Sequence, residues 1–479
     1  MPLILPGNVA SATAPTTFSV ANSCRFNDDD SPDISRTIGT ATDVDKWTYS
    51  VWLKRGNITG AKMLIFSGYS DGSNFGEMIF KNDNKLDWLE YPGGVTGRLT
   101  TNRLFRDVSA WYHLVFVYDS GNATAGNRMR LYVNGTEETS FATDTNPAED
   151  ANSMINTAVL HKVGNSYGTD HFDGYMAECV FCDGQAYAAS DFGEFNEDSP
   201  TIWQPKDVSG LTFGTNGFYL DFEASDNLGN DANGGTDWSE SNLAAADQSL
   251  DSPTNNFCTL NSIAMYPSAG TFSQGNNTWA NATGNYRPHI GTIGLSSGLW
   301  YFETKQTLYA AGQEELLGII GDAATLGTTT SDGGEFGYTA YQYAYNATSG
   351  NIRNNNGLTS YGIASAQNSI LGVYIDLNAN KLYLAKDGTV MNSGTGHSIA
   401  AASTQPGGVY MPGIAGWSGQ QLLLHFNFGN GCFGDTAVSS GNTDANDQGN
   451  FEFDPSAGTF DGASKDFLAI CTKNLAEYG

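Results

Sequence analysis

The feature that most constrains this chain is a period-two alternation of apolar side chains in short runs that end at turns. The clearest run is ILGVYIDLNANKLYLAKDG, residues 370–388, in which Leu371, Val373 and Ile375 fall on one face of an extended chain. Successive side chains of a strand point to opposite faces, so this alternation predicts a strand. Asp387-Gly388 is a dipeptide that favours tight hairpin turns. The run predicts a β-hairpin.

The same pattern recurs along the chain, in WTYSVWLK (47–54), WYHLVFVY (111–118) and RMRLYVNGT (128–136). The second run is apolar on both faces, which is typical of a central strand in a sandwich. The chain also has 57 glycines and only 15% charged residues, which disfavours long helices. We therefore predict an all-β chain with two antiparallel β-sandwich (jelly-roll) domains joined by a long surface connector.

A C-x-x-C motif, Cys179 and Cys182, lies inside the alternating run FDGYMAECVFCDGQ (172–185). In a strand, positions i and i+3 point to opposite faces and lie about 10 Å apart. That separation exceeds the ~7 Å Cα limit for a disulfide and prevents shared metal ligation. We predict two small strand residues, with Cys179 packed inside, and neither a zinc site nor a redox pair.

The charge balance is 22 Lys+Arg against 51 Asp+Glu, a formal net charge of −29. Phosphate backbones and anionic membranes would repel such a chain, so we expect no nucleic-acid partner. Solubility at high ionic strength explains the acidity, and divalent-cation binding is the alternative. No run approaches the ~18 apolar residues of a membrane helix, so we expect no membrane insertion. The start, MPLILPG, has no basic segment typical of a signal peptide.

The composition divides the chain into an N-terminal arm (1–20), a first sandwich domain (21–222), a connector (223–264), a second sandwich domain (265–434) and a C-terminal tail (435–479). The connector is small and polar without periodicity, but Leu228, Trp238 and Leu243 favour docking across a surface. The tail ends in KDFLAICTKNLAEY, where we expect Leu468 and its apolar neighbours to be buried anchors.

The first domain resembles a laminin-G-like, concanavalin-type jelly roll. The resemblance rests on CRFNDDDSPDISR, WTYSVWLKRG, MLIFSGY, WYHLVFVYDS, RMRLYVNG, VGN and FDGYMAECVFCDGQ. It is followed by IWQPKD (202–207) and GTNGFYLDF (214–222), an arrangement similar to that of marine bacteriophage virion proteins. The terminal F-x-A-x-C-T-x-N-L segment is also similar to those proteins.

The second domain resembles a SPRY domain in SSGLWYFET, LGVYIDLNANKLYLAKDG, VYMPGIAG and LLLHFNFG. Asp387 replaces the usual Asn of its Asn-Gly turn, and Tyr383 stands where Phe is often found. The resemblance implies partner binding through variable loops and no catalytic residues. Among the aromatic residues of these loops, we expect Tyr343, Tyr345 and Trp417 to contact sugar.

Some concanavalin-type domains are glucanases, so catalysis needs consideration. A retaining glycosidase requires two carboxylates about 5.5 Å apart. The nearest candidates are Asp87 with Glu90, on opposite faces of a strand, and Asp221 with Glu223, on one face. No third carboxylate or histidine assists the second pair, and an E-x-D-x-x-E signature is absent. We predict that the chain is not an enzyme.

The laminin-G resemblance implies a possible calcium ion at a loop rim, where oxygen ligands suit it. The candidate ligands are Asp28, Asp30, Asp170 and Asp173. Aspartates are also common in turns because they bond to the local backbone. The solvated turn is the favoured interpretation, and calcium is the alternative.

Together the resemblances predict a non-enzymatic bacteriophage structural protein of the tail-fibre or decoration type, at the virion surface and made in the host cytoplasm. The expected partners are other virion proteins, host surface glycans and further copies of the chain, a trimer in a fibre. A purely architectural capsid or tail decoration protein and a polysaccharide depolymerase are the alternatives.

Overall fold

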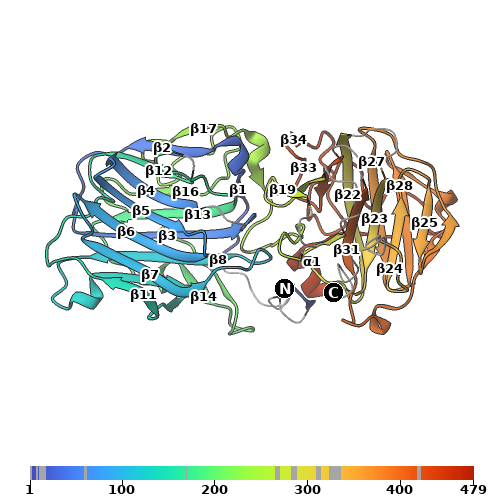
Figure 1. Cartoon of the computed structure of the whole chain (residues 1–479), viewed down its shortest axis with the longest axis horizontal. Helices are drawn as coiled ribbons and strands as arrows, with labels where there is room; N and C mark the ends of the chain where they lie inside the picture. The colour runs from blue at the N-terminus through green and yellow to red at the C-terminus, as the bar shows by residue number, and fades with distance from the viewer. Residues whose placement is uncertain are drawn as a thin grey trace. The chain divides into compact units, whose positions relative to one another are not determined.

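A computed structural model describes residues 3–6, 9, 18–58, 62–168, 170–264, 270–281, 288–308, 314–322, 336–417 and 422–479. The chain forms two compact units: Thr13–Thr254, called here the first sandwich, and Met1–Ala12 with Asn255–Gly479, called the second sandwich. Both are built from antiparallel sheets (Figure 1), which confirms the all-β prediction.

The first sandwich packs two sheets face to face. One has the order β10-β9-β8-β3-β13-β1-β18, with β16 also on β13, and the other β11-β7-β6-β5-β4-β12-β2-β17. The strands of the first sheet are β1 (Ser23–Phe26), β3 (Lys46–Arg55), β8 (Tyr112–Asp119), β9 (Met129–Val133), β10 (Thr136–Glu137), β13 (Gly174–Asp183), β16 (Phe218–Leu220) and β18 (Gln248–Ser249). Those of the second are β2 (Asp33–Thr37), β4 (Met63–Asp71), β5 (Asn74–Phe80), β6 (Lys85–Pro92), β7 (Gly97–Leu104), β11 (Phe141–Thr145), β12 (Leu160–Val163) and β17 (Ser239–Ser241). Smaller elements are β14 (Gly193–Phe195), β15 (Trp203–Pro205), η2 (Asp28–Asp30), η3 (Ala125–Asn127), η4 (Ala189–Asp191) and η5 (Ala245–Asp247).

The core of this sandwich follows the alternation of its sequence. Trp47, Tyr49 and Val51 of β3 all lie in the cluster between the sheets. Strand β8 lies between β3 and β9, and it buries Phe116 in that core while Val117 packs on the outer face. Burial on both faces confirms β8 as a central strand.

The C-x-x-C lies on β13 as predicted. Cys179 packs in the core between the sheets, and Cys182 packs on the opposite face of the same sheet. Both are free thiols. Burial raises the pKa of each thiol well above its ordinary value, so neither has the character of a reactive thiolate.

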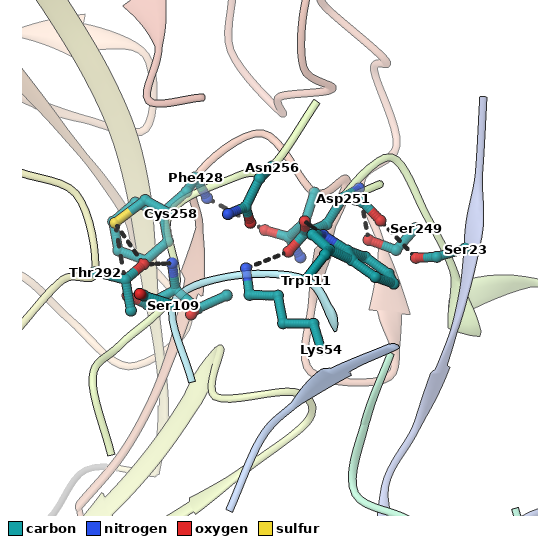
Figure 2. Close-up of polar contacts among 12 residues, drawn as sticks. Ser23, Lys54, Ser109, Trp111, Ser249, Asp251, Asn256, Cys258, Thr292 and Phe428 are labelled. Carbon is teal, nitrogen blue, oxygen red and sulfur yellow. Dashed lines mark hydrogen bonds and ion pairs between the residues drawn. The ribbon is translucent and has the colours of Figure 1, made fainter. Parts of the chain in front are cut away.

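Residues 223–254 differ from the expected connector because they are part of the first sandwich. Leu228 and Trp238 are in its core, and β17 and β18 extend its two sheets. The last residues are held by a buried ion pair, Lys54 Nζ to Asp251 Oδ2 at 2.8 Å (Figure 2). The predicted docking of Leu228 and Trp238 is therefore confirmed, while the separate connector is not.

The second sandwich also has two sheets, ordered β19-β20-β32-β22-β27-β28-β29, with β30 on β28 and β35 on β22, and β21-β31-β23-β24-β25-β26. The strands of the first are β19 (Thr271–Ser273), β20 (Thr278–Asn281), β22 (Leu299–Leu308), β27 (Ile370–Asp376), β28 (Lys381–Lys386), β29 (Thr389–Val390), β30 (His397–Ser398), β32 (Leu422–Asn427) and β35 (Leu468–Ala469). Those of the second are β21 (His289–Ile290), β23 (Glu314–Ile320), β24 (Gln342–Asn346), β25 (Asn351–Asn354), β26 (Gly357–Ser360) and β31 (Met411–Trp417). Smaller elements are β33 (Cys432–Phe433), β34 (Thr436–Ala437), η7 (Asn392–Gly394), η8 (Ala402–Thr404) and α1 (Thr472–Tyr478).

The predicted hairpin is formed by β27 and β28. Val373 and Ile375 of β27 and Leu384 of β28 all face the core, as their alternation requires. The following turn has φ of 48° at Asp387 and 77° at Gly388. Positive φ at both positions is the geometry of a type I′ turn, which confirms that part of the prediction.

Both ends of the chain pack into the second sandwich. Ile4 bridges to Ile293 in the core, so the first residues do not form part of a separate arm 1–20. At the other end Leu468, Ile470 and Leu475 are all buried in the core, which confirms them as anchors. Among the described residues, no helix is long and apolar enough to span a membrane.

A carboxylate at the end of β13 ties the loops of the first sandwich together. Asp183 is fully buried and accepts hydrogen bonds from the backbone N–H groups of Thr42, Asp43 and Asn216 at 2.7–3.2 Å. It also accepts one from the Asn156 side-chain amide at 2.7 Å. Four donors from three separate loops therefore converge on one side chain.

Replacing Asp183 by alanine should destabilise the first sandwich by about 3–5 kcal/mol, because buried donors lose their charged acceptor. Chemical unfolding of the full chain measures this change. Asp207→Ala is the matched control, since Asp207 is exposed and accepts from Ser209 in its own turn. An Asp183→Ala variant as stable as the control would contradict the role given to this carboxylate.

Candidate functional site

Four aromatic side chains gather at one end of the outer face of the β4-β5-β6 sheet, and we call them the aromatic row: Tyr167, Tyr69, Phe75 and Tyr91. Tyr69 lies opposite Phe75, and Phe75 lies opposite Tyr91, on three adjacent strands. Tyr167 comes from the loop after β12 and stacks on Tyr69, with ring centroids 4.6 Å apart and planes at 3°. Phe75 and Tyr91 stack at 5.1 Å.

The aromatic row is open to solvent. Tyr167 is 77% exposed, and the other three rings are half-buried. Leu160 on β12 is paired with Tyr69 on β4, and it extends the apolar surface. Exposed aromatic surface that stays flat and rigid is suited to stacking on the apolar face of a ring-shaped ligand such as a sugar.

Charged groups flank the row on the same face of the sheet. Arg98 makes a bidentate contact with Asp87 at 2.9 and 3.1 Å, and Lys162 donates to Asp33 at 2.7 Å. Burial raises the pKa of Glu77, with Lys62 acting in the opposite direction. Apolar rings bordered by fixed donors and acceptors can orient a polyhydroxylated ligand.

The structure places the predicted sugar-contact tyrosines elsewhere. Tyr343 and Tyr345 lie on strand β24, with 6% and 0% exposure, inside the core of the second sandwich. Their hydroxyls reach the Ala400 N–H at 2.9 Å and the Ile363 carbonyl at 2.5 Å. The expectation that they are exposed loop residues was wrong, because the segment forms a strand that turns both rings inward.

Trp417 ends strand β31, and its side chain lies outside the described residues. Of the other aromatic residues expected in these loops, Tyr341 is exposed and Tyr361 is buried. The prediction for Trp417 therefore stays a prediction, while Tyr343 and Tyr345 are buried. The sequence shows only that Tyr69, Phe75 and Tyr91 occur in successive short runs, and the structure shows that they are paired.

The four candidate calcium ligands do not form one site. Asp30 accepts from the Asn27 amide at 2.5 Å, and Asp170 lies 3.8 Å from Lys62. Asp28 and Asp173 remain close enough to interact electrostatically. Within the described ranges, no group of three or more histidine, cysteine, aspartate or glutamate side chains is placed to hold a metal ion.

Asp173 nevertheless has a free acceptor. Its Oδ2 accepts from the Asn57 N–H at 3.2 Å, while its buried Oδ1 has no hydrogen-bond partner in the part of the chain that the structure describes. Burial, and then the charge of Asp28, raise the pKa of Asp173 well above its ordinary value. A Cβ on Gly56 would lie 2.5 Å from this Oδ1, so glycine leaves room beside it. The donor chemistry fits a hard cation, with two carboxylates instead of four.

A further acidic group was missed by sequence reasoning. Glu178 lies at a β-bulge in β13, with φ of 50°, and accepts from the Tyr219 hydroxyl at 2.7 Å. Burial, and then the charges of Asp221 and Glu223, raise its pKa to about 8, while the Tyr219 bond lowers it. A carboxyl that stays protonated near neutral pH has the property of a general acid. The bulge that places it there is invisible in the alternation.

The other candidate carboxylates have structural partners. Asp87 and Glu90 point to opposite faces, Asp87 toward Arg98 and Glu90 toward the Ser153 hydroxyl and the Met154 N–H. Asp221 accepts from the Glu223 N–H at 3.1 Å in a local turn. Neither pair is arranged as two free carboxylates across a substrate.

Two buried glutamates of the second sandwich contrast sharply. Glu303 accepts four hydrogen bonds, from the N–H groups of Glu452 and Phe453, the Asn427 amide and the Tyr301 hydroxyl. Glu315 on β23 is equally buried, yet neither of its oxygens has a hydrogen-bond partner among the described residues. Burial raises the pKa of Glu303 to about 7 and that of Glu315 to about 8.

Residues 28–187 match the family model described as the concanavalin A-like lectin/glucanases superfamily. No curated protein is similar enough to this chain to match.

Several solved structures share partial similarity. The SPRY domain of human HERC1 is 14% identical over 31% of this chain and 87% of its own, with a TM-score of 0.24. A putative carbohydrate binding protein from Bacteroides ovatus is 14% identical over 47% of this chain and 58% of its own, at a TM-score of 0.34. A SAP-like pentraxin from Limulus polyphemus is 16% identical over 36% of this chain and 80% of its own, at a TM-score of 0.26.

We expect at most one weak calcium site, at Asp173 and Asp28, because only two carboxylates converge there. Calcium at 100 times its Kd would stabilise the first sandwich by about 2.7 kcal/mol. Thermal melting with calcium and with EDTA measures this effect. Asp173→Asn should remove the calcium dependence, and Asp30→Asn should retain it. Identical melting of the wild-type chain in calcium and EDTA would leave the solvated-turn interpretation.

Glu315 should make the second sandwich less stable as the pH rises. Its folded pKa is raised, so its contribution is fully present below the unfolded value near 4.5 and is lost as the pH rises through about 8. Glu315→Gln should therefore flatten the fall in unfolding free energy between about pH 5 and about pH 9, by a few kcal/mol.

Glu303→Gln is the matched comparison for that measurement. The folded pKa of Glu303 is also raised, but only to about 7, so its share of the fall in unfolding free energy should be complete by about pH 7 and that of Glu315 by about pH 8. A carboxamide can accept at only one of its two end atoms, so Glu303→Gln should also lose about 1–3 kcal/mol that Glu315→Gln does not. Equal effects of the two substitutions would show that the hydrogen bonds to Glu303 do not distinguish it from Glu315.

Proposed function

We propose that this chain is a non-catalytic protein of a bacteriophage particle surface, of the tail-fibre or decoration type, that binds host surface glycans. The observation that carries glycan binding is the aromatic row, which presents stacked, solvent-open rings on a rigid sheet. The similarity of residues 28–187 to concanavalin A-like lectins supports the same assignment. The phage setting rests on the IWQPKD, GTNGFYLDF and C-terminal segments of the sequence.

A row of this kind makes a shallow and wet contact. One copy should therefore bind a glycan weakly, on the order of millimolar. When several copies are linked, the binding of the first copy makes binding of the next an intramolecular event, which can raise the avidity by about 10²–10⁴. Useful attachment then calls for a homo-oligomer among the virion proteins, a trimer if the chain belongs to a fibre.

A depolymerase is the second candidate, because Glu178 combines a strained backbone with a pKa of about 8 beside Asp221 and Glu223. Incubation of the purified chain with host polysaccharides decides between them. Reducing ends that appear with the wild-type chain and disappear with Glu178→Gln or Glu223→Gln would establish the enzyme. A non-catalytic chain releases none.

Removing one ring of the aromatic row should weaken glycan binding. Tyr167→Ala deletes the most exposed ring and one stacking partner, worth about 0.5–1.5 kcal/mol, so affinity should fall up to about tenfold. Binding of the purified chain to immobilised host-cell polysaccharides measures the change. The fold should be unaffected, because Tyr167 is mostly exposed.

The control is Phe195→Ala, which deletes another exposed ring, on β14 outside the aromatic row. This variant should bind like the wild-type chain. Equal binding by Tyr167→Ala and the wild type would place the glycan site elsewhere. No binding by any form would favour the architectural decoration protein.

A further inference from the structure

One ion pair of the first sandwich has an unusual setting. Lys54 Nζ lies 2.8 Å from Asp251 Oδ2, and each side chain is only 1% exposed. The Lys54 ammonium also lies 5.8 Å from the centre of the Tyr175 ring. Tyr175, Trp52 and Trp111 belong to one apolar cluster on this face of the sheet. The pair is therefore buried, with aromatic side chains beside it.

The other lysine–aspartate pairs of similar length lie nearer to solvent. Lys162 and Asp33 are 2.7 Å apart, but Lys162 is 21% exposed. Lys465 and Asp376 are 2.5 Å apart, and Lys465 is 18% exposed. Water stabilises both charges at such sites, whereas burial penalises them strongly. The Lys54–Asp251 pair is thus the most completely withdrawn from solvent of these three.

The carboxyl of Asp251 is also fixed in position. Its Oδ1 accepts a hydrogen bond from the Trp111 indole N–H at 3.1 Å. Its backbone carbonyl accepts from the Ser23 hydroxyl at 2.6 Å, and its backbone N–H donates to Ser249 Oγ at 3.2 Å. Figure 2 shows Lys54 and Trp111 converging on Asp251 from different segments of the chain. Holding two reacting groups beside each other makes their reaction effectively unimolecular.

We propose that Lys54 and Asp251 form a covalent amide that links β3 to the end of the first sandwich. The site supplies what such a condensation needs: a lysine amine and a carboxyl carbon held together away from water, and an N–H donor aimed at the second carboxyl oxygen.

The bond forms with loss of one water molecule. A proton passes from the Lys54 ammonium to Asp251 Oδ2, which leaves a neutral amine facing a neutral acid. Nζ attacks Cγ, and the negative charge that develops on Oδ1 is stabilised by the Trp111 N–H. The Cγ–Oδ2 bond then breaks, and Oδ2 departs as water with the transferred proton and one proton from Nζ. The amide is left without charge, and no oxidant or reductant is required.

The link would enclose most of the first sandwich between residues 54 and 251. A cross-link of this kind restricts the unfolded chain in the way that a disulfide does, and an amide is not broken by reducing agents. It would act on the segment 239–251, whose small and polar composition offers little apolar surface to hold it in place. A particle exposed to shear and proteases would gain kinetic stability from it.

Peptide mapping of the denatured full-length chain by trypsin and mass spectrometry tests the proposal directly. We expect the peptide containing Lys54 to be joined to the peptide containing Asp251, with a combined mass lower by one water and no cleavage after Lys54. Recovery of the two peptides only as separate species of full mass would overturn the proposal. Lys162 and Asp33 serve as the internal control and should remain unlinked. A link there as well would contradict the argument from burial.

Two variants sharpen the test. Asp251→Asn should form the same amide with release of ammonia, so its linked peptide should have the same mass as the wild-type one. Lys54→Arg keeps a cation and should give the two peptides unlinked. A linked species that persists in Lys54→Arg would assign the cross-link to another residue and overturn the proposal.

Discussion

Backbone N–H groups outside the sheets need acceptors, and in this chain buried carboxylates provide them. The constraint arises because long connections run between short strands, and a buried N–H without a partner is costly. Asp183 satisfies three such groups in the first sandwich. Glu303 satisfies two in the second, and Asp444 accepts from the N–H groups of Asn446, Gln448 and Ala469. Each of these carboxylates therefore connects separate segments of its own sandwich.

This arrangement changes the meaning of the acidity. The net charge of −29 was interpreted as an aid to solubility, with cation binding as the alternative. Several of the carboxylates are instead buried acceptors. Burying a carboxylate disfavours its charged form, and burial accordingly raises the pKa of Glu90 and of Glu303 to about 7. Where hydrogen bonds are numerous the charged form is stabilised in return. Among the described residues, the Glu315 oxygens and Asp173 Oδ1 accept no such hydrogen bonds. We therefore expect pH to affect stability most at Glu315, and a cation to do so at Asp173.

Alternation in the sequence was enough to predict which strands exist and which of their faces are buried, as β3, β8 and the β27–β28 hairpin demonstrate. It was not enough where a segment also contains turn-like residues. YAYNATSG was interpreted as a loop, although Tyr343 and Tyr345 alternate as strand residues should, and both are in the core. The docking of residues 223–254 was predicted from Leu228, Trp238 and Leu243, but the membership of this segment in the first sandwich was not. That membership depends on the short strands β17 and β18 and on contacts such as the one between Asp251 and Lys54. Long-range contacts of one side chain leave no periodic signal.

The candidate site depends on strand register, which the sequence does not specify. Tyr69, Phe75 and Tyr91 meet because β4 pairs with β5 through shifts at two bulges, whereas β5 pairs with β6 in unbroken register. On the inner face of the same strands, a Cβ at Gly68 would lie 2.7 Å from His161, and one at Gly76 would lie 3.0 Å from Ile155. Close packing beneath the sheet therefore requires small residues at the positions beside Tyr69 and Phe75. A register slip of one residue would expose those inner positions and bury the rings, so the packing of the core and the placement of the aromatic row are fixed together.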